Sequence, residues 1–121
     1  MTLDKVDVLK IDKDCHVAKE WIDAYPWLVL VTCQRYGVKV ISVKMCRSRR
    51  KGIHFYIEIS PPVEAELANR IQWLLGDDHG RVGFNQARIE SSLNEWNKLF
   101  ELPNRRLRTI YRTTDALSKS F

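Results

Sequence analysis

The sequence of 121 residues has no long hydrophobic run, which excludes a membrane-spanning helix. No stretch approaches the ~20 consecutive apolar residues that such a helix needs. The N-terminal residues, MTLDKVDVLKIDKD, also lack the basic start and apolar core of a secretory signal. With 45% hydrophobic and 29% charged residues, the chain is predicted to be a folded, soluble, cytoplasmic protein without a membrane partner.

Cysteine and histidine are scarce, with three residues of each. Cys15, Cys33 and Cys46 are odd in number and form no C-x-x-C pair, so neither a disulfide framework nor a zinc ribbon is indicated. The histidines include no His-x-His pair, which disfavours a nuclease of the two-histidine type. The Gly-aromatic-Gly signature of RNA-recognition modules is absent as well.

Positive charge, in contrast, is abundant and unevenly distributed. Twenty Lys and Arg residues against fifteen Asp and Glu give a net charge of +5, which favours an anionic partner. The cations are concentrated in two segments, one with Arg47, Arg49, Arg50 and Lys51 and the other with Arg105, Arg106, Arg108 and Arg112. Such segments favour contact with nucleic-acid phosphates, although similar runs also occur on ordinary solvated surfaces.

Hydrophobic periodicity predicts a single α+β domain. Alternating patterns predict strands over 6–11, 38–46 and 53–59. Helical spacing predicts helices from 12 or 14 to about 25, over 63–75, and from 77 or 78 onward. Residues 26–37 are predicted to form a short helix in preference to a strand, and residues 95–102 a fourth, edge strand. We expect residues 1–103 to form the domain and residues 104–121 a basic, flexible tail.

This βαββαβ order is that of the ferredoxin-like, or RNA-recognition-like, sandwich with one open sheet face. Helices are expected to cover one face, and the other is expected to present Lys10, Asp12, Ser42, Lys44, His54, Tyr56 and Glu58. On that face a tyrosine would stack on unpaired bases while cations hold phosphates. The predicted nucleic-acid contacts are Lys44, Arg47, Arg49, Arg50, Lys51, His54, Tyr56, Arg105 and Arg106.

The predicted function is therefore binding of nucleic acid, single-stranded DNA or RNA in preference to duplex. Trp96 and Phe100 would either extend the stacking platform or close the core. An alternative is a protein-interaction adaptor or inhibitor that forms a homodimer through its sheet face, for which the four tryptophans would supply contact area.

Two motifs resemble those of the archaeo-eukaryotic primase-polymerases. "KIDKD" is similar to their acidic first motif, hydrophobic-Asp-x-Asp, matched by Asp12 and Asp14. "SRRKGIHFYI" is similar to their second motif, matched by Ser48, Gly52 and His54. The resemblance covers about the first 60 residues. It implies an RNA-recognition-like sheet and metal-dependent nucleotidyl transfer, in which the two aspartates bind Mg²⁺ or Mn²⁺ and the histidine contacts the nucleotide phosphate.

The third motif of that family, an aspartate from a later strand, has no clear match. In the predicted fourth strand the only candidates are Glu95, Asn97 and Glu101. This departure favours a minimal or degenerate relative, of the kind found in archaeal mobile elements, that binds nucleic acid during replication.

If the protein is an enzyme, Asp12, Asp14 and His54 are the predicted catalytic residues, and Glu58 could join the two aspartates as a metal ligand. Glu58 could equally pair with Lys44 across the hairpin. No other cofactor is indicated. Asp77 and Asp78, between two glycines, are predicted to cap a helix.

Overall fold

The computed structural model describes residues 3–48, 52–99, 101 and 105–113. Its elements, in chain order, are β1 (Val6–Lys13), α1 (Lys19–Arg35), β2 (Lys39–Arg47), β3 (Ile53–Val63), α2 (Ala65–Leu74), α3 (His79–Glu90) and β4 (Arg108–Arg112). The four strands form one open antiparallel sheet in the order β1-β3-β2-β4. The fold class is therefore α+β, as the sequence predicts.

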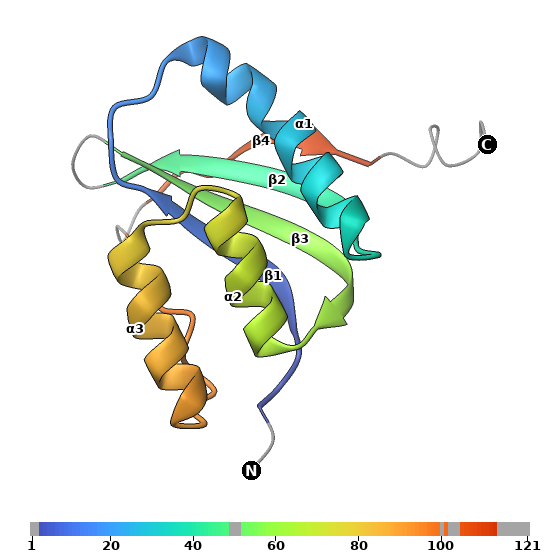
Figure 1. Ribbon diagram of the computed structural model, residues 1–121. Coiled ribbons are helices and arrows are strands. Elements are labelled where there is room, and N and C mark those ends of the chain that lie inside the picture. The colour runs from blue at the N-terminus through green and yellow to red at the C-terminus, as the bar shows by residue number, and fades with distance from the viewer. Residues whose placement is uncertain (1–2, 49–51, 100, 102–104, 114–121) are drawn as a thin grey trace.

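The core lies between the sheet and the helices, which Figure 1 shows on one side of the sheet. Leu9 and Ile11 of β1 and Phe55 and Ile57 of β3 are fully buried, because alternate residues of a strand face the same way. The Tyr25 ring of α1 stacks on Phe55 with centroids 4.1 Å apart. Burying each side chain of this size contributes about 1.5–3 kcal/mol to stability.

The predicted strands and their core-facing residues are largely confirmed. One difference is a bulge between Val40 and Ser42, where β2 shifts its register against β3. The bulge places Val40 opposite Ile59 in the core, with an exposed fraction of 3%. A strict alternation from Val43 backwards would put Val40 on the other face.

Helix α1 begins later and ends later than the first helix that the sequence predicts, since it starts at Lys19, whereas Asp12 belongs to β1 and Asp14 follows that strand. It runs without interruption through Pro26, where one helix was expected to end and a second to begin. A proline inside a helix costs ~3 kcal/mol because it lacks an N–H donor. Here Tyr25, Val29 and Cys33 on either side are all buried on the sheet, and their burial offsets that cost.

The C-terminal part differs most from expectation. Residues 91–99 contain no strand, and Trp96, 1% exposed, closes the core. The fourth strand is β4, in a segment expected to be a flexible tail. Its Ile110 and Tyr111 pack against the core, and β-branched and aromatic residues of this kind favour strands. Phe100 and residues 114–121 lie outside the described residues.

Within the part of the chain that the structure describes, no helix is long and apolar enough to cross a membrane. Cys15, Cys33 and Cys46 are free thiols.

Candidate functional site

The sheet face opposite the helices is a grid of side chains fixed by the strand register. Its rows, read across the strands, are Val8, Glu58, Ser42 and Arg112; then Lys10, Tyr56, Lys44 and Thr109; then Asp12, His54 and Cys46. This grid brings together most of the residues that the sequence singles out.

The expected stacking platform on this face is covered. Tyr56 is 9% exposed and His54 is 5% exposed. The Tyr56 hydroxyl donates to Glu101 at 3.0 Å, and the guanidinium carbon of Arg105 lies 5.4 Å from the centre of the Tyr56 ring. Arg105 also pairs with Glu101 at 2.8 Å. The expectation that the Tyr56 ring is open to solvent is therefore wrong, because residues that follow α3 lie over it.

Asp12 and His54 do come together, as the alternating strand pattern predicts. They are cross-strand partners, and Asp12 Oδ1 lies 3.5 Å from His54 Nε2. Burial lowers the pKa of His54, although Asp12 acts in the opposite direction. Burial also raises the pKa of Asp12, with His54 opposing. In this pair, burial therefore disfavours the charged form of both the imidazole and the carboxyl group, and each charge partly offsets that effect on the other.

The predicted metal ligands are not gathered at one point. Asp14 lies beyond the end of β1 and is exposed. Glu58 pairs with Val8, four residues along β1 from Asp12, which corresponds to about 13 Å at ~3.3 Å per residue. Among the described residues no three His, Cys, Asp or Glu side chains lie close enough to hold a metal ion. Glu58 therefore cannot share a metal with Asp12.

The hairpin between β2 and β3 gives Ser48 and Gly52 a structural role. The N–H of Ser48 donates to the Gly52 carbonyl and the N–H of Gly52 donates to the Ser48 hydroxyl, both at 3.0 Å. The predicted contacts Arg49, Arg50 and Lys51 lie outside the described residues.

The outer edge of β1 is covered by Gln72, which the sequence analysis does not single out, and by Asp77 and Asp78, which it assigns to helix capping alone. The N–H of Lys10 donates to Gln72 Oε1 at 3.0 Å, and the N–H of Asp12 donates to Asp77 Oδ1 at 2.8 Å. The N–H of Asp78 donates to the Asp12 carbonyl. These contacts replace the hydrogen bonds of a neighbouring strand, so this edge is protected against pairing with another chain.

Arg81 joins this edge to the segment after α3. Its guanidinium donates to the Lys10 carbonyl, to Asp77 at 2.7 Å, to Asn97 at 2.6 Å and to the Lys98 carbonyl. Burial raises the pKa of Asp77 to about 6, and Arg81 opposes that rise. The predicted capping role is confirmed for Asp78, whose side chain accepts from the N–H of Arg81.

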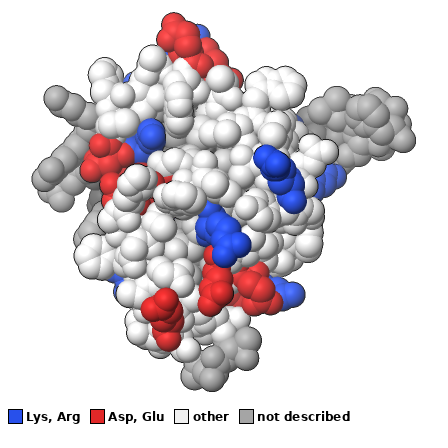
Figure 2. All heavy atoms as spheres, viewed as in Figure 1, with Lys and Arg blue, Asp and Glu red and all other residues white. Residues whose placement is uncertain are grey.

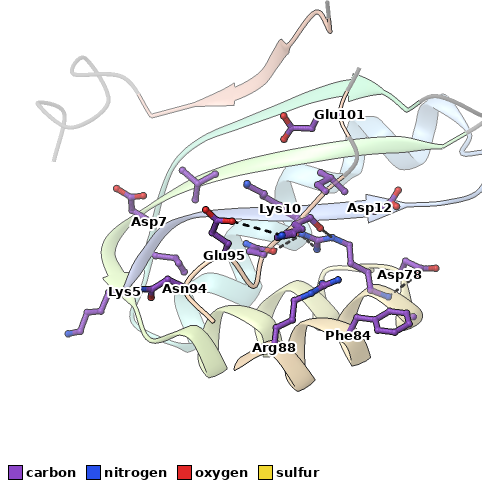
Figure 3. Close-up of a pocket in the computed structure, with 17 residues that line it drawn as sticks. Lys5, Asp7, Lys10, Asp12, Asp78, Phe84, Arg88, Asn94, Glu95 and Glu101 are labelled. Atoms are coloured by element: carbon purple, nitrogen blue, oxygen red, sulfur yellow. Dashed lines mark hydrogen bonds and ion pairs between the residues drawn. The ribbon is translucent and has the colours of Figure 1, made fainter. Parts of the chain in front are cut away.

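A cleft of about 930 Å³ lies between β1, α3 and the residues after α3, namely 94–99 and Glu101 (Figure 3). Figure 3 shows Lys10 and Arg88 in its lining together with Asp7, Glu95 and Glu101. Because both signs of charge alternate along its wall, the cleft does not favour a polyanion.

Cations are instead gathered around β2 and β4, on the part of the sheet away from β1, with Arg105 reaching over Tyr56 of β3. We call this surface the basic edge; it comprises Lys44, Arg47, Arg105, Arg106, Arg108 and Arg112. Pairing of β4 with β2 brings the two halves together, since Arg108 is the partner of Met45, two residues before Arg47. Of these six cations only Arg105 makes an ion pair with another described residue. The side seen in Figure 2, in contrast, carries scattered charges of both signs.

Comparison of the chain with protein-family models, with curated proteins and with solved structures gives no match.

Proposed function

We propose that this protein binds nucleic acid through the basic edge. The observation that carries the proposal is the pairing of β4 with β2. It joins two basic segments, 44–47 and 105–112, that are about sixty residues apart in the sequence. Exposed guanidinium groups on one edge suit a row of phosphates, because each can form charge-assisted hydrogen bonds to phosphate oxygens.

The proposed contacts are to the phosphate backbone. Tyr56 is covered by Arg105 and Glu101, so the base-stacking that would favour single strands has no support on this face. Binding through phosphates depends little on base sequence and weakens steeply as salt rises.

The test is fluorescence anisotropy with labelled single-stranded and duplex oligonucleotides over a series of salt concentrations. We expect binding to both forms at low salt, with log affinity falling linearly against log salt concentration. Absence of binding to either form at low salt would overturn the proposal.

A second candidate function, metal-dependent nucleotidyl transfer, is favoured by one observation, the 3.5 Å contact between Asp12 and His54. The exposed Asp14 would have to complete a metal site with Asp12. Primer extension with Mg²⁺ or Mn²⁺ tests this function. Extension that disappears when both aspartates are replaced by Ala would support it, and no extension by the unaltered protein would reject it.

The finer description of the fold and of the protein's context belongs to the same proposal. The β1-β3-β2 order, with α1 and α2 on one face, supports a ferredoxin-like core to which β4 is added beside β2. A cytoplasmic protein of replication, distantly related to the primase-polymerases, is the context that fits nucleic-acid binding best.

A further inference from the structure

Helix α1 has apolar residues on the side that faces away from the core. Trp27 is 73% exposed, Val31 is 55% exposed and Leu28 is 43% exposed. Ala24 is exposed beside them. At 3.6 residues per turn these four residues fall within an arc of about 100°, opposite the buried Tyr25, Val29 and Cys33. An ordinary surface helix has polar residues in this position, so the outer face of α1 has the composition of a contact surface.

The spacing of this face fits a second α1 running in the opposite direction. A two-fold axis between Trp27 and Leu28 places the small Ala24 of one copy opposite Val31 of the other. It also places Trp27 of each copy opposite Leu28 of the other. Apolar residues at intervals of three and four, as at 24, 27, 28 and 31, are the pattern that antiparallel helices bury between them.

Charge at the two ends of the helix fits the same arrangement. Glu20 lies in the first turn of α1 and Arg35 in the last. Neither makes an ion pair with another described residue. The same two-fold axis places each Glu20 opposite Arg35 of the other copy. The helix dipole also favours an acidic residue in the first turn and a basic residue in the last turn. The two charges therefore indicate a second copy as the partner only in combination with the apolar face.

We infer that α1 is a self-association surface, through which two copies of this chain form a two-fold symmetric dimer with antiparallel α1 helices. Such an interface is isologous, since the same residues serve both copies. One helix pair buries less than the ~800 Å² per partner of a standard interface. The dimer therefore belongs to the weak, concentration-dependent class. This inference is independent of the proposed nucleic-acid binding.

Sedimentation equilibrium over a wide range of protein concentration tests the inference. We expect a monomer–dimer equilibrium that Trp27→Glu weakens about 30-fold or more, because it places a carboxylate at the centre of the interface. Trp73→Glu is the matched control, since Trp73 is also exposed, at 51%, but lies on α2. It should leave the equilibrium unchanged. Circular dichroism checks that both variants fold.

Charge reversal distinguishes the antiparallel pairing from other contacts. Glu20→Arg alone and Arg35→Glu alone should each weaken the homodimer, since like charges then face each other. A mixture of the two variants should form heterodimers, because every contact between them is again between opposite charges.

Three results would overturn the inference: a monomer at all concentrations, equal effects of Trp27→Glu and Trp73→Glu, or no heterodimer in the mixture. If the protein is monomeric but sediments with lipid vesicles through this face, the occupant is a membrane surface instead of a second copy.

Discussion

Gly52 is a position where one methyl group would disturb two strands. A Cβ at this residue would overlap with the carbonyl oxygen of Lys13 and would also press on the Asp14 backbone. Both neighbours are main-chain atoms, which cannot swing aside as a side chain can. The glycine is needed for the close approach of the hairpin to the end of β1, a requirement that its sequence context does not reveal.

Gly52→Ala should therefore lower the free energy of unfolding by about 1–3 kcal/mol. Gly83 is the matched control, because it lies inside α3 and a Cβ there meets nothing within 4 Å. Gly83→Ala should raise the free energy of unfolding by about 0.5–1 kcal/mol. Urea denaturation measures both changes, and effects of the same sign would contradict this account of Gly52.

For single residues, the sequence predicts which side chains lie next to each other in the sheet better than it predicts which side chains are exposed. Asp12 and His54 are expected on one face and are cross-strand partners, because strand register follows from the alternating pattern. The burial of Tyr56 cannot be predicted in this way. It depends on Glu101 and Arg105, more than forty residues later in the chain, and local periodicity carries no signal of such contacts.

At the scale of elements, β1 is an edge strand, and no described residues form a neighbouring strand on its outer side. Gln72 and Asp77 accept from its N–H groups, and Arg81 donates to one of its carbonyls. The side chain of Asp77 is 0% exposed and that of Arg81 is 9% exposed. A buried pair of this kind requires both partners, since either alone would be an uncompensated buried charge.

Arg81→Ala should destabilise the protein by about 3–5 kcal/mol at pH 8, and by less at pH 5. The pKa of Asp77, about 6 in the folded protein, is raised above the ordinary value of about 3.9. The stability that this group contributes is therefore full below pH ~4 and is lost as pH rises through about 6. Without Arg81 the pKa of Asp77 rises further. The loss of Arg81 therefore destabilises the protein more at pH 8, where the buried carboxylate is unpaired, than at pH 5, where the carboxyl group is protonated.

Chemical denaturation at the two pH values measures this difference. The control is Arg70→Ala, which removes an exposed arginine on α2 and should change stability little at either pH. An Arg81→Ala cost that is equal at pH 5 and pH 8 would show that Asp77 does not titrate in this range.

The existence and type of most elements follow from the sequence, but their ends do not always. β1, β2, β3, α2 and α3 are predicted from periodicity. α1 extends past Pro26 because its apolar face continues to Cys33. β4 is missed because Thr109, Ile110 and Tyr111 are a short run of β-branched and aromatic residues between arginines. β4 pairs with the backbone of β2, which would otherwise be the second edge strand of the sheet that the described residues form.

For the whole molecule, the decisive feature is the convergence of two basic segments that the sequence presents separately. Composition predicts an anionic partner, and each segment alone could be ordinary surface. Only the pairing of β2 with β4 sets Arg108 and Arg112 beside the strand that carries Lys44 and Arg47. The sequence thus predicts that the partner is anionic, whereas the place where the partner would bind follows only from the fold.

The most direct test compares two double variants that remove the same charge from opposite edges of the sheet. Arg108→Ala with Arg112→Ala alters the basic edge, and Lys5→Ala with Lys98→Ala alters the cleft side. Each lowers the net charge from +5 to +3. The first should weaken oligonucleotide binding and reduce the salt slope by about 2, since each phosphate contact contributes about 0.9. The second should leave the slope unchanged. Equal losses in both variants would contradict a binding site at the basic edge.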